Sequence, residues 1–572
     1  MITLYGAMLV LLLPLVAGLI IGLAGSQLRE QSYRIGVPAV VLAFIGGVWT
    51  LYTVSVDGPI HIALYQRTPA AQNWLQFALY IDRLSAVMMV LITGVSSIIH
   101  LYSIRYLQQD RGYARFYALL GLITFALLSL VASANLFMLF VFWQLMSWLL
   151  YLLLAYNYTH PPAVNAAFKT WIVLRLGDVA FLGGVLLAYS VYGTLEFPLL
   201  FERAAESSAT LPLWPGSGME ISTVTAITLL LFVGAMAKSA QLPLHVWLPD
   251  TMDTPTPVSA LMHAGIVNAG GFLINRLAPL YGLTPGTLHV VFVIGALTTI
   301  LGASMMLTQN DIKKMLGFST IGQMGYMIME CGLGAFALAI FHLIAHGIFK
   351  ASFFLYAGNV IHVARRTPKL PPTRNADQDV EPSRLPWFTG ITMTLVLPLV
   401  ILLIAHGVLQ VPLRDAQGAV ILLFFAWVTS SQAILSLYRL RAVESWKVVG
   451  AMVLTLLLVV FTYLWAVEAF TYFLYPAPGE AARYFQAAAW NPWLFDLFVI
   501  LVTLLIGGGW AVAYTNIRGQ RILMSAWVSA SAPRLYLFIW NRLYIDALYA
   551  RFGQAIIRLA RRMDARLPEW LP

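Results

Sequence analysis

The stretch from Gly234 to Asn268 gathers charged and protonatable side chains within apolar surroundings: GAMAKSAQLPLHVWLPDTMDTPTPVSALMHAGIVN. Lys238 lies five residues before Pro243, and proline interrupts a helix because it lacks the backbone N–H and its ring clashes with the preceding turn. About 15 largely apolar residues precede Lys238, which places its amine roughly 10 Å or more from the nearest membrane surface. A broken helix beside a buried amine is typical of ion-handling sites. The alternative is a kinked helix whose lysine reaches the surface.

Arg175 and Asp178 form a second candidate group. They are three residues apart, so they share one face of the helix expected over 164–192 and lie roughly 16–21 Å from its end, near the bilayer centre. An ion pair is tolerated there at lower cost than either charge alone. The sequence leaves open whether this is a static packing pair or a pair that switches.

His342, His346 and Lys350 form a third group, at positions i, i+4 and i+8 of one helical face about 12 Å long. Histidine holds or releases a proton near pH 7, so this stripe can pass protons along the helix. The segment HLIAH could instead bind zinc, but it lacks the glutamate of HExxH and any nearby cysteine or carboxylate set. His263 adds another protonatable group near mid-depth. A lone histidine is usually a packing residue, and only its company favours a role here.

His406 enters through a weak internal similarity. Residues 237–244 can be laid beside residues 405–413 with a one-residue slip, five predicted spans later. An odd number of spans makes the two copies cross the membrane in opposite senses, as inverted repeats do, and makes His406 the counterpart of Lys238. Chance similarity between short apolar segments is the alternative. All these groups together predict a polar axis along which protons move.

Composition limits the class of protein. The chain has 572 residues, of which 60% are hydrophobic and only 10% charged, and its mean hydropathy is +0.80. These values predict an all-α polytopic membrane protein. The single cysteine, Cys331, excludes disulfides and cysteine-ligated clusters within the chain, and no nucleotide fingerprint or phosphate-binding loop occurs. The chain therefore has no predicted cofactor, metal site or catalytic centre of its own, and its net charge of +10 is not distributed as nucleic-acid binding would require.

Apolar runs of membrane length predict about 15 transmembrane helices. They lie near 4–24, 35–56, 83–106, 115–133, 135–157, 164–192, 222–245, 256–280, 287–308, 312–331, 334–362, 386–411, 418–440, 448–475 and 494–515. With the N-terminus outside, the inner loops and the tail carry 25 of the 34 Lys and Arg residues and the outer loops carry 6. The positive-inside rule therefore predicts a multi-pass protein of the cell (inner) membrane with its N-terminus outside and its C-terminus in the cytoplasm.

Behind the last span, residues 533–567 predict one amphipathic helix on the cytoplasmic interface. Ile545, Leu548, Phe552, Ile556 and Leu559 recur at three- and four-residue steps, and arginines occupy the other faces. Burial of the apolar face and attraction to anionic lipid would hold it there. Contact with a partner subunit is the alternative.

Five segments carry a family resemblance. They are YIDRLSAVMMVLITGVSSIIHLYS at 80–103, VLRLGDV at 173–179, KSAQLPLHVWLPDTMDTPTPVSALMHA at 238–264, QNDIKKMLGFSTIGQMGYM at 309–327 and FHLIAHGIFKASFFL at 341–355. They resemble the antiporter-like subunits shared by respiratory complex I, its large distal subunit especially, and Mrp-type cation/proton antiporters. The resemblance covers residues 75–365 well and the remainder by topology.

The resemblance implies a domain organisation. It gives N-terminal helices at 1–114, two inverted five-helix repeats with broken helices at 115–280 and 281–440, C-terminal helices at 441–515 and a basic amphipathic tail at 516–572. It also implies roles: Lys238 as the central proton carrier, His263 as a link between half-channels, and Arg175 with Asp178 as a switching pair. His342, His346 and Lys350 would form the connecting chain.

Two departures from the family pattern stand out. The family places a glutamate beside tryptophan in the fifth span as the partner of the lysine, whereas this chain has Trp143 followed by Gln144, which can hydrogen-bond but cannot neutralise Lys238. The family's exit lysine or glutamate in the twelfth span is also absent, which leaves His406 as the nearest titratable group. In addition, the long lateral helix of the complex I subunit is replaced by one short interfacial helix.

These departures favour a divergent branch, the membrane subunit of DAB-type inorganic-carbon uptake systems. That resemblance implies a large soluble carbonic-anhydrase-like zinc subunit as the partner, with zinc on the partner, and a gradient-driven flow of protons or another cation. The first alternative is a proton-pumping subunit of an NADH:quinone oxidoreductase or an Mrp-like antiporter, which would have other complex I-like subunits as partners. The second is a membrane anchor that no longer conducts.

Overall fold

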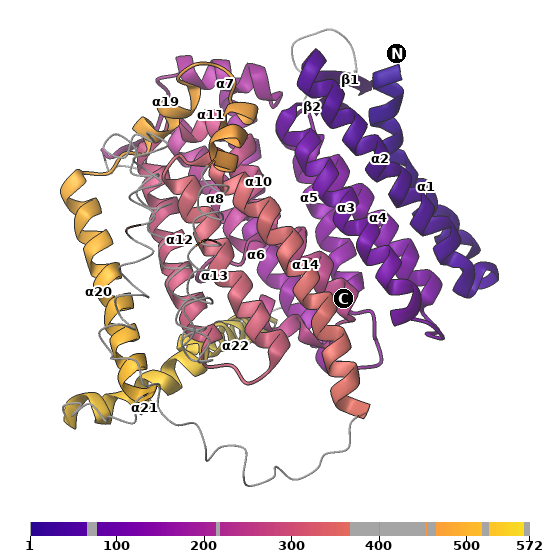
Figure 1. Ribbon diagram of the computed structural model, residues 1–572. Helices are drawn as coiled ribbons and strands as arrows, with labels where there is room; N and C mark the ends of the chain where they lie inside the picture. Colours follow the sequence, from indigo (N-terminus) through magenta and orange to yellow (C-terminus); the bar gives the residue numbers. More distant parts are fainter. Residues whose placement is uncertain are drawn as a thin grey trace.

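Figure 1 shows the computed structural model as a bundle of long helices that run roughly side by side, with short elements at both ends of the bundle. The structure describes residues 2–65, 77–212, 218–366, 465–517 and 526–564, together with the single positions 400 and 454. The predicted spans 386–411 and 418–440 therefore lie outside the described residues, as does most of 448–475.

The two ends of the bundle differ. One end, here called the β1–β2 end, carries a hairpin of β1 (Ile60–Tyr65) and β2 (Phe77–Ile81), the surface helices α7 (Phe197–Glu206) and α19 (Glu480–Ala487), and the short pair β3 (Thr210–Pro212) and β4 (Glu220–Ser222). The other, here called the α22 end, carries α21 (Ala526–Trp540) and α22 (Ile545–Asp564). The excess of basic residues predicts that the α22 end faces the cytoplasm.

The long helices follow the predicted apolar runs closely. They are α1 (Ile2–Leu28), α2 (Tyr33–Asp57), α3 (Arg83–Tyr106), α4 (Tyr113–Val131), α5 (Leu136–Leu154), α6 (Pro161–Tyr192), α12 (Pro285–Met306), α13 (Ile312–Gly332), α14 (Phe336–Arg366) and α20 (Pro492–Ile517). By length and composition, eight segments of the described chain can cross a membrane, or nine if the bent pair 480–487 and 492–504 is one span. The chain is therefore a polytopic helical membrane protein.

Side-chain caps define where several helices begin. Asp82 accepts a hydrogen bond from the backbone N–H of Ser85 before α3, Asn135 accepts one from Met138 before α5, and Asp311 accepts one from Lys314 before α13. Such caps satisfy N–H groups that have no partner within the helix. These three caps set the residues at which α3, α5 and α13 begin.

Two predicted spans, 222–245 and 256–280, are each interrupted. The first is α8 (Thr223–Lys238), which ends at Lys238 and is followed by irregular chain and the short 3-10 helix η2 (Leu248–Asp253). The second consists of α9 (Thr256–Ala264), the 3-10 turn η3 (Ile266–Asn268), α10 (Ala269–Arg276) and α11 (Ala278–Tyr281). Pro243 predicts the first break; the second falls at Gly265, whose backbone leaves the helical region at φ −127° and ψ −62°.

Glycine permits the closest helix contacts. A Cβ on Gly295 of α12 would lie 2.4 Å from the backbone N of Met329, and one on Gly302 would lie 2.5 Å from that of Gly322, so α12 and α13 touch backbone to backbone. A Cβ on Gly177 of α6 would lie 2.3 Å from the Cβ of Ala237 on α8. These contacts hold α13 against α12 and hold α8 against α6.

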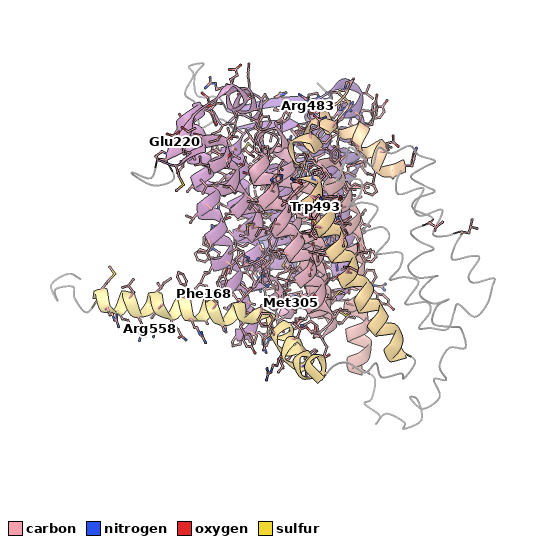
Figure 2. The ribbon with its side chains drawn as sticks, turned by 90° about the vertical axis from the view of Figure 1, so that its left-hand side faces the viewer. Phe168, Glu220, Met305, Arg483, Trp493 and Arg558 are labelled. Carbon is pink, nitrogen blue, oxygen red and sulfur yellow. The ribbon has the colours of Figure 1, made fainter. Side chains whose placement is uncertain are left out.

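The tail differs from the single helix predicted over 533–567. It forms α21 and α22, separated by the turn η6 (Arg542–Tyr544), in which all three residues have positive φ. Figure 2 shows α22 running outward along the base of the bundle with Arg558 on its outer side. Leu548, Phe552 and Ile556 remain exposed on α22. The amphipathic pattern is therefore present, but it begins after a bend whose side chains contact the bundle.

Candidate ion-translocation site

Lys238 is the last residue of α8 and is completely buried. Its Nζ donates a hydrogen bond to the Ser147 hydroxyl of α5 and lies 4.9 Å from the centre of the Trp143 ring, also on α5. A cation is attracted to the face of an aromatic ring, and the attraction strengthens away from water. The amine is therefore held by a hydroxyl and an indole, without a direct carboxylate contact among the described residues.

Arg175 and Asp178 form an ion pair on α6, with the guanidinium NH2 2.8 Å from Asp178 Oδ2. The other carboxylate oxygen of Asp178 accepts a hydrogen bond of 2.7 Å from Trp143 Nε1. Trp143 therefore stands between this pair and Lys238: its N–H contacts Asp178, and its ring faces the amine. Whether the pair switches stays a prediction.

Gln144 takes a different partner from the one its sequence position suggests. Its side-chain carbonyl accepts a hydrogen bond from Arg175 NH1, whereas Trp143, its neighbour on α5, faces Lys238. Successive residues of a helix point about 100° apart, so only one of the two can face α8. The position where the family has a glutamate thus contacts the arginine of the ion pair in this chain.

The backbone groups freed by the break after Lys238 find partners nearby. Trp247 Nε1 donates to the Ala237 carbonyl at 3.0 Å, and the backbone N–H of Leu242 donates to Thr298 Oγ1 at 3.0 Å. Ser239 Oγ donates to the Val267 carbonyl at 2.6 Å. These contacts satisfy polar groups away from water. They also tie the α8 break to the second break at η3.

The three residues of the predicted stripe all lie on α14. The rings of His342 and His346 lie 6.3 Å apart, and Lys350 donates from Nζ to the Leu316 carbonyl of α13 at 3.4 Å. All three side chains are buried. His346 has no hydrogen-bond partner on either ring nitrogen among the described residues, so both are available to water or a proton.

His263 lies beside this stripe. Its ring stacks on Phe354 of α14, with centroids 4.3 Å apart and planes 11° apart, one turn beyond Lys350. It is close enough to interact electrostatically with Lys350 and His346. No hydrogen bond in the described part of the chain joins His263 to Lys238, so the structure brings the predicted residues together as two groups. His406 lies outside the described residues.

Three features were missed by sequence reasoning. Ser147 and Trp143 contact Lys238 directly, and neither residue type signals such a role within an apolar helix. His245, in the break after Lys238, is completely buried. Glu330 is buried near the end of α13 and contacts His342. A lone carboxylate in an apolar run is a signal, but Glu330 lies at the edge of the predicted span.

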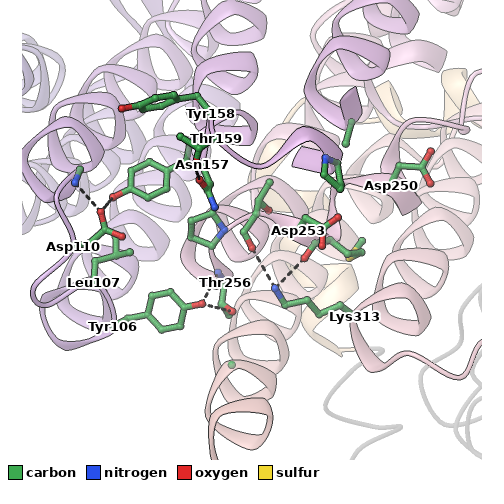
Figure 3. Close-up of a pocket in the computed structure, with 18 of the residues that line it drawn as sticks. Tyr106, Leu107, Asp110, Asn157, Tyr158, Thr159, Asp250, Asp253, Thr256 and Lys313 are labelled. Carbon is green, nitrogen blue, oxygen red and sulfur yellow. Dashed lines mark hydrogen bonds between the residues drawn. The ribbon is translucent and has the colours of Figure 1, made fainter. Parts of the chain in front are cut away.

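A cavity of ≈ 1970 Å³ opens at the α22 end. Figure 3 shows Tyr106, Asp110, Asn157, Asp253, Thr256 and Lys313 around it. Lys313 donates to the carbonyls of Met252 and Thr254, and the Tyr106 hydroxyl donates to Thr256 Oγ1. Its walls include η2, the start of α9 and the start of α13.

Next to this cavity, four charges join the tail to the first broken helix. Lys169 of α6 contacts Asp250 of η2 and Asp546 of α22 at 2.6 Å each, and Arg542 contacts the same two carboxylates at 2.7 and 3.1 Å. Burial alone would raise the pKa of the Asp250 carboxyl, but Arg542 and Lys169 outweigh it and lower that pKa below its ordinary value. We name these residues the tail clamp.

Metal binding has no support in the described residues, which contain no group of three or more His, Cys, Asp or Glu side chains able to hold an ion. The alternative interpretation of HLIAH as a zinc site therefore lacks further ligands in that part of the chain.

Comparisons with known proteins agree with the geometry. The family model described as "NADH:quinone oxidoreductase/Mrp antiporter, TM" matches residues 133–431, and that of "NADH-Ubiquinone oxidoreductase (complex I), chain 5 N-terminus" matches residues 69–117. The "Probable inorganic carbon transporter subunit DabB1" of Halothiobacillus neapolitanus is 39% identical over 567 residues, which are 97% of this chain and 98% of that protein.

Other relatives match over less of their length. NADH-quinone oxidoreductase subunit L of Rickettsia bellii is 39% identical over 359 residues, which are 62% of this chain and 56% of that protein, so the match spans little more than half of that relative. Among solved structures, the Mrp complex from Dietzia sp. DQ12-45-1b has a TM-score of 0.60 at 22% identity, covering 99% of this chain and 60% of that one.

A second solved structure, the archaeal membrane-bound sulfane sulfur reductase, has a TM-score of 0.55 at 20% identity and covers 90% of this chain and 96% of that one. At these identities the two structures show the fold alone. The sequence matches go further: the chain belongs to the antiporter-like membrane subunit family of NADH:quinone oxidoreductases and Mrp antiporters.

Proposed function

We propose that this chain is the proton-conducting membrane subunit of an inorganic-carbon uptake complex, in which it lets protons or another cation down their gradient. The observation that carries the proposal is the similarity to the DabB1 subunit over 98% of that protein, against 56% of the subunit L relative. The alignment with DabB1 covers 97% of this chain, whereas the alignment with subunit L covers 62% of it.

The site supports conduction. Lys238 is the proton carrier in the first group, held between Ser147 and Trp143 and able to bind or release one proton. A buried amine is stabilised as the neutral form by burial and as the cation by water or a nearby carboxylate. Movement of Asp178 relative to Arg175 therefore changes the occupancy of Lys238, with Trp143 in contact with both groups.

The second group carries the proton onward. His263, Lys350, His346 and His342 provide successive protonatable sites, and the polar cavity at the α22 end supplies water to the foot of α13. Histidine suits such a relay because each ring accepts a proton on one nitrogen and releases it from the other.

Gln144 favours the uptake system over a redox-driven pump. Where the pump subunits of the family carry a glutamate, this chain has a neutral side chain that hydrogen-bonds to Arg175. The proposed partner is the large soluble carbonic-anhydrase-like zinc subunit that the resemblance implies, with the ion flow driving one-way hydration of carbon dioxide there.

Two measurements test this proposal. Lys238→Ala should abolish carbon accumulation in cells while the complex still assembles, because the central proton carrier is lost; unchanged accumulation would refute conduction through Lys238. Mild-detergent purification of the tagged chain from its native membrane, followed by mass spectrometry and zinc analysis, should recover one large zinc-bearing soluble subunit. Recovery of many subunits with flavin and iron–sulfur clusters would instead identify a redox-driven pump.

A further inference from the structure

Glu330 is a buried carboxylate that the proposed path does not yet use. It lies on α13 two residues before the helix ends at Gly332, at the β1–β2 end of the bundle, and only 1% of its surface is exposed. An unpaired charge at such a depth is expensive, so a carboxyl group there is either partnered or neutral. Its contacts therefore indicate what it does.

The contacts of Glu330 lead to the stripe on α14. Glu330 Oε2 lies 3.0 Å from His342 Nδ1, while Gln323 Oε1 lies 3.0 Å from His342 Nε2. Gln323, Tyr326 and Glu330 follow one another at steps of three and four residues on one face of α13, and the Tyr326 ring lies 4.8 Å from the His342 ring. Three side chains of one face of α13 thus surround one histidine.

Gln323 determines the resting form of His342. A carbonyl oxygen only accepts, so the contact with Gln323 places a proton on Nε2 of His342 in the resting state. Nδ1 is then the nitrogen that accepts a proton from Glu330, and Nε2 is the nitrogen that can release one. The 3.0 Å contact is satisfied either by imidazolium with carboxylate or by neutral imidazole with carboxylic acid, so one proton is shared between the two residues.

The Tyr326 side chain also hydrogen-bonds to the Glu330 carboxyl group. Oε1 of that group is buried and has no hydrogen-bond partner among the described residues. A buried acceptor without a partner is destabilising unless water or a proton occupies it, so Oε1 is the atom left to contact water.

The position of Glu330 completes a crossing of the membrane. From Ile312, which lines the cavity at the α22 end, to Glu330 is about 27 Å along α13, close to the hydrocarbon thickness of a bilayer. Lys350, His346 and His342 occupy about 12 Å of this interval on the facing side of α14. Beyond Glu330 only the turn at 333–335 remains, and Tyr484 of the surface helix α19 lies against it.

We propose that Glu330 is the proton-carrying residue at the β1–β2 end of the path, so that protons enter through Glu330 and cross between α13 and α14 rather than through the twelfth predicted span. In each transfer, the Glu330 carboxylate takes a proton from water at the β1–β2 end and becomes a neutral carboxylic acid. It then gives that proton to His342 Nδ1, which leaves a carboxylate and an imidazolium, and the imidazolium passes a proton on toward His346. This inference rests on the proposed conduction.

The test compares Glu330→Gln with Glu330→Asp in the tagged chain, purified with its native subunits and placed in liposomes. Proton flux is measured with an entrapped pH-sensitive dye under an imposed membrane potential. Glutamine keeps the size of the side chain and a hydrogen bond to His342 but cannot carry the proton. We expect Glu330→Gln to lower the flux at least tenfold, Glu330→Asp to retain part of it, and Glu202→Gln, on exposed α7 at the same end, to leave it unchanged.

A small weak acid added to the compartment at the β1–β2 end provides the second measurement. Formate at millimolar concentration should restore flux in Glu330→Gln by carrying the proton that the side chain no longer carries, an effect that a merely structural role for Glu330 would not produce. Wild-type flux in Glu330→Gln would overturn the inference, as would a loss that formate does not restore.

The same assay separates this inference from the proposed function. If Lys238→Ala stops the flux and Glu330→Gln does not, conduction holds and the entry through Glu330 is wrong. Loss of flux in His406→Leu together with normal flux in Glu330→Gln would place the entry in the twelfth predicted span. If the chain conducts no protons in any form, the proposed conduction itself fails.

Discussion

Gln144→Glu restores the carboxylate that the family carries at this position, and the structure predicts that it lowers proton flux. Gln144 already accepts a hydrogen bond from Arg175 NH1, and Arg175 NH2 is paired with Asp178. A glutamate would therefore place Arg175 between two carboxylates. Lys238 would gain no direct partner, because its own contacts on α5 are Trp143 and Ser147.

The size of the effect follows from the change in that hydrogen bond. Replacing a neutral acceptor by a charged one makes a buried hydrogen bond to arginine stronger by about 1–2 kcal/mol. If Arg175 must separate from its partners during each transport cycle, the same energy slows that step about 5- to 30-fold. The resting state is stabilised and the switched state is not.

The liposome assay of proton flux measures this directly. Gln144→Met is the matched control, because it keeps the length of the side chain and introduces no charge, and its flux should stay near that of the wild type. Flux in Gln144→Glu equal to or above the wild type would refute trapping of Arg175.

Two further predictions concern the architecture. Asp250→Asn should loosen the tail clamp by about 1 kcal/mol and raise the mobility of α22, measured as the fluorescence anisotropy of a label at Arg558→Cys. The folded-state pKa of Asp250 is lowered, so its stabilisation of the tail clamp is complete above the ordinary aspartate range and is lost as the pH falls through that lowered pKa. The label on the wild type should therefore become as mobile as the label on the variant only in acid. A label whose anisotropy responds neither to Asp250→Asn nor to acid would contradict the assigned contacts. Gly270→Ala should lower the thermal midpoint of the purified chain, because its Cβ would lie 2.4 Å from Ser239 Oγ and 2.6 Å from the Ala235 carbonyl, an overpacking of about 1–3 kcal/mol. Gly286→Ala, with nothing within 4 Å, is its control, and equal midpoints would show that α10 and α8 can move apart.

Apolar runs sufficed to predict most helices in the described chain. The predicted span 83–106 coincides with α3, and 312–331 differs from α13 by one residue at its end. Both helices begin after an aspartate whose side chain caps the first turn, so hydropathy and capping agree on the boundary. The break after Lys238 was also predicted, since proline removes a backbone donor wherever it stands.

The remaining features depend on neighbours that the sequence does not specify. Gly265 breaks the second helix, yet a single glycine in an apolar run is equally compatible with a continuous helix. The sequence could not tell which of Trp143 and Gln144 faces Lys238, because that depends on the rotation of α5 about its axis. Glu330 was overlooked because the turn after α13 is covered by α19, which places the carboxylate deeper than its distance from the end of the span suggests.

The gap between the two groups of titratable residues lies where the two helix breaks meet. Ser239, next to Lys238, donates to the carbonyl of Val267, four residues after His263, and Gly270 lets α10 approach α8 at that height. The break after Lys238 and the break at η3 therefore turn polar backbone groups toward each other. We call the place where the two breaks meet the junction. Since no described side chain bridges that distance, we expect proton transfer between the groups to depend on water or a side-chain movement admitted at this junction. The junction would then determine when a proton can pass between the group around Lys238 and the group formed by His263 and the stripe on α14.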